Sequence, residues 1–221
     1  MATRSPLLRR CVLGLIAAGL ALPPCIAAPK KRRDSREDWQ QPARVVADLG
    51  LTDGSRIADI GCGRGYFTYA LAKAVGEKGM VYATEISEKS LKSVSDRVKA
   101  DGLKNILPVL SDPADTKLDS NSLDAAFICN VLHHVPKEGR LPLVKDIARS
   151  LRPGGCFFIV DWRFDAKIGH DIGRRIPRDE LVKLGSDAGL TLDAECYYLE
   201  HQVFLRFRKP TGGEKAPGAG K

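Results

Sequence analysis

A glycine-rich segment, residues 59–65, is the part of the sequence whose residue types and spacing most clearly indicate chemistry. It reads Asp-Ile-Gly-Cys-Gly-Arg-Gly and follows a short apolar run. Glycine at this point would let the backbone turn sharply and let a ligand approach where a Cβ atom would collide. A dinucleotide-binding turn would carry another glycine where this sequence has Tyr66, which disfavours an NAD-dependent oxidoreductase. Asp59, two residues before Gly61, favours a positively charged ligand instead.

Acidic residues also end the next two apolar runs. Glu85 follows the run 80–84, and Asp112 follows the run 106–110. If these runs are parallel strands, their carboxyl ends meet at the edge where open α/β sheets bind ligands. Each acid also has a structural interpretation, as a turn cap, a solvated strand end or an Asx turn before a proline. Their joint occurrence at successive strand ends favours a shared binding site.

The elements that would position these residues alternate between strands and helices. We expect strands at 56–60, 80–84, 106–110, 123–129 and 156–161, and helices at 66–75, 88–100, 141–151 and 177–188, with a further helical pattern from Trp39. Two final apolar runs, 194–198 and 202–207, are too close in sequence for a crossover and should pair antiparallel. The prediction is an α/β fold with a mostly parallel seven-stranded sheet, helices on both faces and a C-terminal antiparallel hairpin.

With these motifs in this order, the sequence resembles the class I S-adenosylmethionine-dependent methyltransferases over about residues 38–208. The segments that carry the resemblance are 59–65, 81–85, 111–112, 124–130 and 151–155. The resemblance implies a Rossmann-like, doubly wound fold, S-adenosyl-L-methionine as the cofactor, and transfer of a methyl group to a small-molecule acceptor. It does not identify that acceptor, because a fold hosts many functions.

The resemblance also implies which residues hold the cofactor. Glu85 would bind both ribose hydroxyls, since a carboxylate can accept two hydrogen bonds from a cis-diol. Asp112 would accept a hydrogen bond from the exocyclic amine of adenine. The sulfonium and ammonium groups of the cofactor would suit Asp59. The complete expected set is Asp59, Gly61, Cys62, Gly63, Tyr66, Glu85, Ile86, Asp112 and Asn130.

The sequence gives little information about the residues that would bind the methyl acceptor. Methyl transfer from a sulfonium is an in-line displacement that requires alignment and exclusion of water more than a strong base. His133 and His134 follow the fourth strand and are the candidate catalytic residues, able to orient or deprotonate an acceptor. Alternatively, one packs against the sheet and the other caps a helix. Adjacent histidines project in different directions, so we expect no metal site without further ligands. Further candidates for lining the acceptor pocket are Asp161-Trp162-Arg163 at the end of the fifth strand and His170-Asp171 with Arg174-Arg175 in the next loop, the alternative for the two arginines being solvated loop charges.

Two other functions are compatible with the sequence. One is a non-enzymatic module that binds S-adenosylmethionine, because the sequence shows no acceptor signature. The other is the disfavoured NAD-dependent oxidoreductase.

Four of the six cysteines lie beyond residue 28 and are interpreted as buried thiols, with a Cys62–Cys129 disulfide as the alternative in an oxidising compartment.

Charge is concentrated at one end of the 221-residue chain, whose formal net charge is +8. Residues 1–36 hold eight of the 35 lysines and arginines but one of the 27 acidic residues. The remainder is nearly neutral, so it lacks the basic surplus that a nucleic-acid-binding surface requires.

The first 28 residues have the layout of a secretory signal. Arginines precede the apolar run 11–22, and small residues follow it. Twelve apolar positions are too few to span a bilayer, which takes about 20 residues. The expected organisation is a signal peptide at 1–28, a basic linker at 29–37, a methyltransferase domain at 38–209 and a flexible tail at 210–221. We therefore expect export to the periplasm or outside the cell and no stable membrane insertion after cleavage, with a cytoplasmic location if the leader is not functional. The oligomeric state is not predicted.

Overall fold

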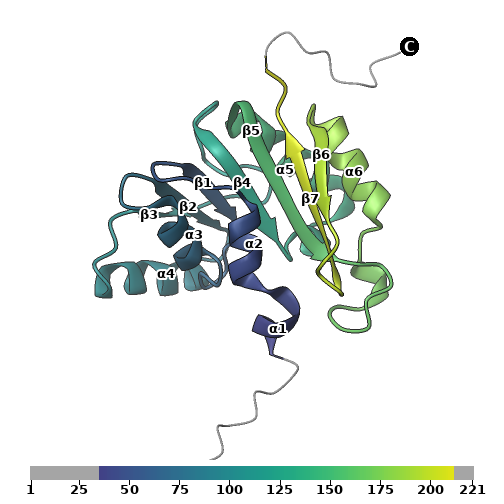
Figure 1. Ribbon diagram of the computed structural model, residues 1–221, viewed down its shortest axis with the longest axis horizontal. Helices are drawn as coiled ribbons and strands as arrows, with labels where there is room; N and C mark the ends of the chain where they lie inside the picture. Colours follow the sequence, from purple (N-terminus) through teal and green to yellow (C-terminus); the bar gives the residue numbers. More distant parts are fainter. Residues whose placement is uncertain (1–34, 212–221) are drawn as a thin grey trace, which may run out of the picture. The chain divides into compact units, whose positions relative to one another are not determined.

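The computed structural model describes residues 35–211. The predicted signal peptide, most of the basic linker and nearly all of the predicted tail lie outside these residues. The described part forms a sheet of seven strands with helices packed against it (Figure 1). The strands are β1 (Arg56–Ile60), β2 (Met80–Glu85), β3 (Ile106–Leu110), β4 (Leu123–Cys129), β5 (Leu151–Trp162), β6 (Thr191–Cys196) and β7 (Gln202–Arg208). The helices are α1 (Arg36–Gln40), α2 (Pro42–Asp48), α3 (Thr68–Val75), α4 (Glu88–Ala100), α5 (Lys137–Ser150) and α6 (Arg178–Asp187), with short 3-10 helices η1 (Leu132–His134) and η2 (Ile172–Arg174).

The strand order is β3-β2-β1-β4-β5-β7-β6. Strands β1 to β5 run parallel, whereas β7 pairs antiparallel with both β5 and β6. The predicted α/β fold, with a Rossmann-like parallel sheet and a C-terminal antiparallel hairpin, is confirmed. From β1 the chain winds outward to β2 and β3 and then returns to β4 on the other side. The carboxyl ends of β1 and β4 therefore flank the topological switch point, where sheets of this kind bind ligands.

Alternation along the strands divides the core into two layers. In β4, Phe127 packs into the layer that contains α2, α3 and α4, whereas Ala126 and Ile128 pack into the layer that contains α5 and α6. Because successive side chains of a strand point to opposite faces, one buried strand supplies both layers. These residues are at most 1% exposed, as expected for a central strand covered on both sides.

Local signals set the ends of the helices. At α4, the Ser87 side chain accepts a hydrogen bond from the backbone N–H of Ser90 at 3.3 Å, which caps the helix just after β2. Leu91 and Val94 are buried on one face of this helix. Gly102 follows the last turn with φ +64°, a conformation that glycine adopts readily. None of the helices in residues 35–211 is long and apolar enough to cross a bilayer.

Several element boundaries differ from the sequence-based prediction: α3 begins at 68 rather than 66, α5 begins at 137 rather than 141, and β6 spans 191–196 rather than 194–198. Two further differences have a local cause. The helical pattern from Trp39 is two helices, because Gln41 has φ +46° immediately before Pro42, and a residue preceding proline is disfavoured in the helical conformation. Strand β5 begins at Leu151 rather than at 156 and includes Pro153 and Gly154. A register shift between Leu123 and Ala125 accommodates this irregular start.

Candidate functional site

The glycine turn that follows β1 is shaped by its close approach to the segment after β4. Gly61, Gly63 and Gly65 have φ values of +66°, +57° and +86°. A Cβ atom on Gly61 would lie 2.6 Å from Val131 Cγ2, whereas a Cβ atom on Gly63 would meet nothing within 4 Å. Gly61 is therefore required for packing, and Gly63 leaves open space beside the turn.

Glu85 connects the end of β2 to this turn. Its Oε2 accepts a hydrogen bond from the Gly63 N–H at 2.8 Å, and its Oε1 accepts one from the Ser87 N–H at 2.9 Å. A carboxylate offers about four lone-pair positions, so both oxygens retain the capacity to bind a ligand hydroxyl.

Asp59 is a buried carboxylate that no lysine or arginine of residues 35–211 contacts directly as an ion pair. It is 3% exposed, and its Oδ2 accepts a hydrogen bond from Thr68 Oγ1 at 2.6 Å. Burial raises the pKa of Asp59 to about 6, and the charge of Glu85 adds to the rise, whereas the Thr68 hydrogen bond and the charge of Arg36 act in the opposite direction. A positively charged ligand group would supply a direct partner.

Two adjoining cavities line this edge of the sheet. The larger, about 830 Å³, is lined by Asp59, the glycine turn and Tyr66. The smaller, about 280 Å³, is lined by Glu85 and other residues that follow β2, β3 and β4. Gly61 and Asn130 line both cavities. All nine residues predicted to hold the cofactor line one or both of them: Asp59, Gly61, Cys62, Gly63, Tyr66, Glu85, Ile86, Asp112 and Asn130.

Asp112 is already engaged in the structure. Its Oδ2 lies 2.5 Å from Lys117 Nζ, which also contacts Asp115 at 2.6 Å. A backbone bridge joins Asp112 to Asp115 and closes a turn. Asp112 thus combines the turn role considered from the sequence with a position at the smaller cavity. Ile86 beside it is 59% exposed, which provides an apolar surface for a planar ring.

Asn130 is held in place by residues that the sequence analysis did not identify. It has φ +58°, and its Oδ1 accepts a hydrogen bond from Gln202 Nε2 at 2.6 Å. Gln40 Nε2 in turn donates to Gln202 Oε1 at 3.1 Å. Both glutamines are buried. No local pattern could reveal this contact, because Gln40 and Gln202 are 162 residues apart in the chain.

Helix α1 also contributes to the larger cavity, which corrects the predicted domain start at residue 38. Arg36 and Glu37 line this cavity. The Arg36 guanidinium lies 3.7 Å from the centroid of the Tyr66 ring, and the Tyr66 hydroxyl donates to Glu37 Oε1 at 3.4 Å. Burial, followed by the charge of Glu37, raises the pKa of Tyr66 to about 12. Residues 36 and 37 belong to the folded domain and not to a linker.

The two histidines after β4 occupy different environments. His133 is buried, its Nδ1 lies 2.6 Å from Asp161 Oδ1, and it lines neither cavity. His134 is exposed and lines the smaller cavity. Partial burial and the neighbouring charge of His133 lower the pKa of His134. His170, from the loop after β5, lies against both, with ring centroids 4.7 Å away in each case. The sequence predicts no metal site unless further ligands are present. In the structure, His170 is such a further candidate ligand.

The cysteines of the described residues are free thiols, so the Cys62–Cys129 disulfide is not formed. Cys129 Sγ instead accepts a hydrogen bond from Gln40 Nε2 at 2.9 Å. Burial raises the pKa of both thiols well above the usual range, which makes them poor nucleophiles.

Comparisons with known proteins agree with this geometry. Residues 57–155 match the family described as a methyltransferase domain. A demethylmenaquinone methyltransferase from Geobacillus stearothermophilus is 33% identical over 111 residues, which cover 50% of this chain and 47% of that protein. A protein of the same name from Staphylococcus aureus (strain JH9) is 35% identical over 117 residues, covering 53% and 46% respectively. The chain thus spans about half the length of the curated relatives it matches.

A solved structure of a SAM-dependent methyltransferase from Aquifex aeolicus superposes with a TM-score of 0.74 and 25% identity, covering 80% of this chain and 93% of that one. The residues at the two cavities fit S-adenosylmethionine, because Asp59 is a buried carboxylate with no ion pair among residues 35–211 and Gly63 leaves space that a side chain would fill. Residues 57–155 thus form a methyltransferase domain of the class I S-adenosylmethionine-dependent type, whose cofactor is S-adenosylmethionine.

Proposed function

We propose that this chain transfers a methyl group from S-adenosylmethionine to a small-molecule acceptor. The observation that carries the proposal is the pair of adjoining cavities at the carboxyl ends of β1, β2 and β4, lined by all nine expected cofactor residues. S-adenosylmethionine supplies a methyl group activated by attachment to a positively charged sulfur.

The chain's own residues would bind and align the reactants. The Glu85 carboxylate accepts the ribose hydroxyls, and Ile86 provides an apolar surface for the adenine ring. The Asp59 carboxylate attracts the cationic end of the cofactor into the larger cavity. Asn130, held by Gln202, lies where the two cavities meet and fixes the wall between them.

For the acceptor, we propose an apolar aromatic compound of the quinol type. The curated relatives are named for demethylmenaquinone, which supports this class. The segment after β5, which brings His170 to the site, exposes the large apolar side chains of Phe164 and Ile168 in the loop and of Ile172 at the start of η2. Exposed apolar surface gathered on one loop favours contact with an apolar ligand. His134 is the histidine placed to contact this acceptor, because it lines the cavity and His133 does not.

Calorimetric titration followed by a turnover assay tests the proposal. The purified chain should bind S-adenosylmethionine and its demethylated product, and it should release that product when a demethylated quinol is added. Binding without turnover on quinols or other small nucleophiles would support the non-enzymatic module instead. Failure to bind either form of the cofactor would overturn the proposal.

Cofactor affinity should decrease as the pH falls below about 6, because burial places the pKa of Asp59 there. A bound cation favours the ionised carboxylate, so the bound protein has a lower Asp59 pKa than the free protein. Affinity should therefore be constant above this pH and should fall by up to about tenfold per pH unit below it.

Dissociation constants measured by calorimetry at several pH values provide the check on this prediction. The matched variant is Asp59→Asn, which should bind more weakly at pH 8 and lose the dependence in the acid range. The same pH dependence in Asp59→Asn and in the unsubstituted chain would assign it to another group.

We further propose that the chain is exported, as the arginines and apolar run of residues 1–28 suggest. Cell fractionation with N-terminal sequencing of the mature chain tests this. Cleavage near residue 28 and recovery outside the cytoplasm are expected.

A further inference from the structure

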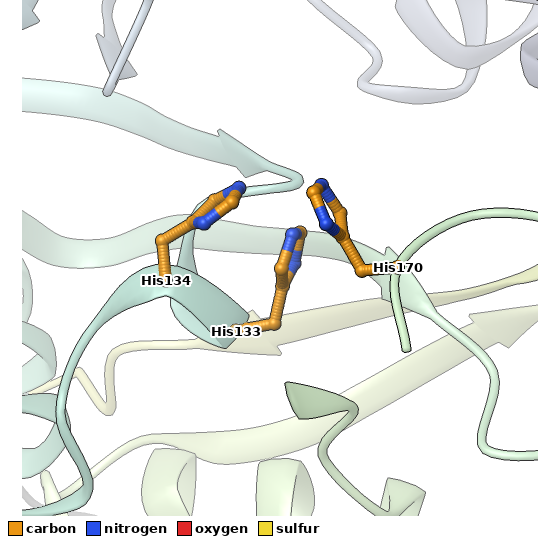
Figure 2. A group of neighbouring side chains, drawn as sticks. All are labelled: His133, His134 and His170. Carbon is orange, nitrogen blue, oxygen red and sulfur yellow. The ribbon is translucent and has the colours of Figure 1, made fainter. Parts of the chain in front are cut away.

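Three histidines from two separate segments come together beside the smaller cavity. His133 and His134 belong to η1, and His170 belongs to the loop between β5 and η2. One ring nitrogen from each lies within 4.8 Å of the others. Figure 2 shows the three rings turned toward a common point above η1. His133 is buried, whereas His134 and His170 are exposed and can rotate.

The hydrogen bonds around His133 leave its Nε2 atom available to bind a metal ion. Its Nδ1 is held by Asp161 Oδ1 at 2.6 Å, and Asp161 also accepts hydrogen bonds from the backbone N–H groups of His133 and Trp162. A carboxylate at Nδ1 favours the tautomer of the neutral ring that carries its proton there, and in that tautomer Nε2 has a free lone pair. This Nε2 is buried and has no hydrogen-bond partner in the described structure. Metal-binding histidines typically donate their other ring N–H to a carboxylate in this way.

The third histidine is held in position by its loop. The Arg175 guanidinium donates to the backbone carbonyls of Phe164, Ala166, Ile168 and His170, at distances between 2.5 and 3.2 Å. Gly169 packs so closely on the Trp162 indole that a Cβ atom would lie 2.6 Å from it. Trp162 directly follows Asp161, so the same strand end fixes both His133 and the backbone next to His170.

We propose that His133, His134 and His170 together bind one divalent transition-metal ion of the zinc class. Three imidazole ligands with an open fourth position are a typical set for zinc. Zinc–nitrogen bonds of about 2.0–2.1 Å require ligand nitrogens roughly 3.4 Å apart. Rotation of the two exposed rings toward the fixed His133 would close the present separations. His134 also lines the smaller cavity, so the open position faces the space beside the cofactor.

The zinc site does not depend on methyl transfer, and it assigns His134 a role as ligand rather than base. The negative charge of Asp161 behind His133 favours a bound cation, and Arg174 is the nearby cation that opposes it. An acceptor oxygen or a water molecule would fill the fourth position, where a metal ion lowers the pKa of a bound hydroxyl.

Zinc binding to the full chain, stripped of metal with a chelator, tests the proposal. Competition with a chromophoric chelator should show one tightly bound zinc ion per chain. The His170→Ala variant should bind about 100-fold more weakly or not at all, and Asp161→Asn about tenfold more weakly. Cobalt(II) should give the intense visible absorption of a four-coordinate site in the unsubstituted chain and not in His170→Ala.

The matched control is His201→Ala, because His201 is the fourth histidine of the sequence and lies outside the cluster. It should bind zinc as the unsubstituted chain does. His170 is exposed, so its replacement should leave the circular dichroism spectrum and the thermal midpoint of the metal-free chain unchanged. No tight zinc binding to the unsubstituted chain, or equal binding by His170→Ala, would overturn the proposal.

Discussion

Replacement of Glu85 by alanine should weaken S-adenosylmethionine binding by about 100-fold. Hydrogen bonds to a charged group contribute about 1.5–3 kcal/mol each, and two ribose hydroxyls depend on this carboxylate in the proposed binding mode. A total loss of about 3 kcal/mol corresponds to about two orders of magnitude in the dissociation constant. The same substitution removes the acceptor for the Gly63 N–H, which loosens the glycine turn as well.

Calorimetric titration of two further variants separates these contributions. Glu85→Gln retains one oxygen that can accept the Gly63 N–H and should bind with intermediate affinity. Glu88→Ala is the matched control, because Glu88 is an exposed glutamate in the first turn of α4. Its affinity should be unchanged. Equal affinities for Glu85→Ala and Glu88→Ala would show that the cofactor does not use this edge of the sheet.

The Gly61→Ala substitution should destabilise the fold by about 2–5 kcal/mol. A left-handed backbone costs a non-glycine residue about 1–2 kcal/mol, and overpacking a tight contact costs about 1–3 kcal/mol. Both apply here, since Gly61 has φ +66° and the new Cβ would lie 2.6 Å from Val131 Cγ2. Valine is rigid at χ1, so the neighbour cannot simply rotate away. Urea denaturation monitored by circular dichroism measures the change.

Gly50→Ala is the control for the backbone contribution. Gly50 has φ +64°, and a Cβ atom at this position would meet nothing within 4 Å, so about 1–2 kcal/mol should be lost. The double variant Gly61→Ala/Val131→Ala should recover the packing part of the loss relative to Val131→Ala alone. If Gly61→Ala costs no more than Gly50→Ala, the close approach to Val131 does not constrain the turn.

Local sequence features explain most of what could be predicted. The bounds of β1, β3 and β4 agree with the expected ranges, because these short apolar runs are flanked by serine, asparagine and glycine, which favour turns. The glycine turn, Glu85 and Asp112 were identifiable because each directly follows such a run. Position after a strand places a residue at the carboxyl edge, whatever the rest of the chain does.

The remaining features depend on contacts between distant segments. Gln202 begins β7, which pairs with β5, and Gln40 of α1 contacts it from a segment 162 residues away, which no spacing reveals. His170 reaches His133 because Arg175 folds the intervening loop back on Trp162, and an isolated histidine in a loop carries no such information. The first two residues of α1, Arg36 and Glu37, fall within the linker predicted at 29–37, yet Arg36 packs on the Tyr66 ring.

The position of β7 has a consequence for biosynthesis. Within residues 35–211 this strand follows all the other strands in the chain, yet it lies between β5 and β6 and carries the glutamine that holds Asn130. Until β7 has been synthesised and has paired with β5, the growing chain carries the glycine turn without the side chain that holds the wall between the two cavities. The cofactor pocket is therefore completed late in synthesis, and a product truncated before residue 202 would retain the glycine turn without a finished binding site.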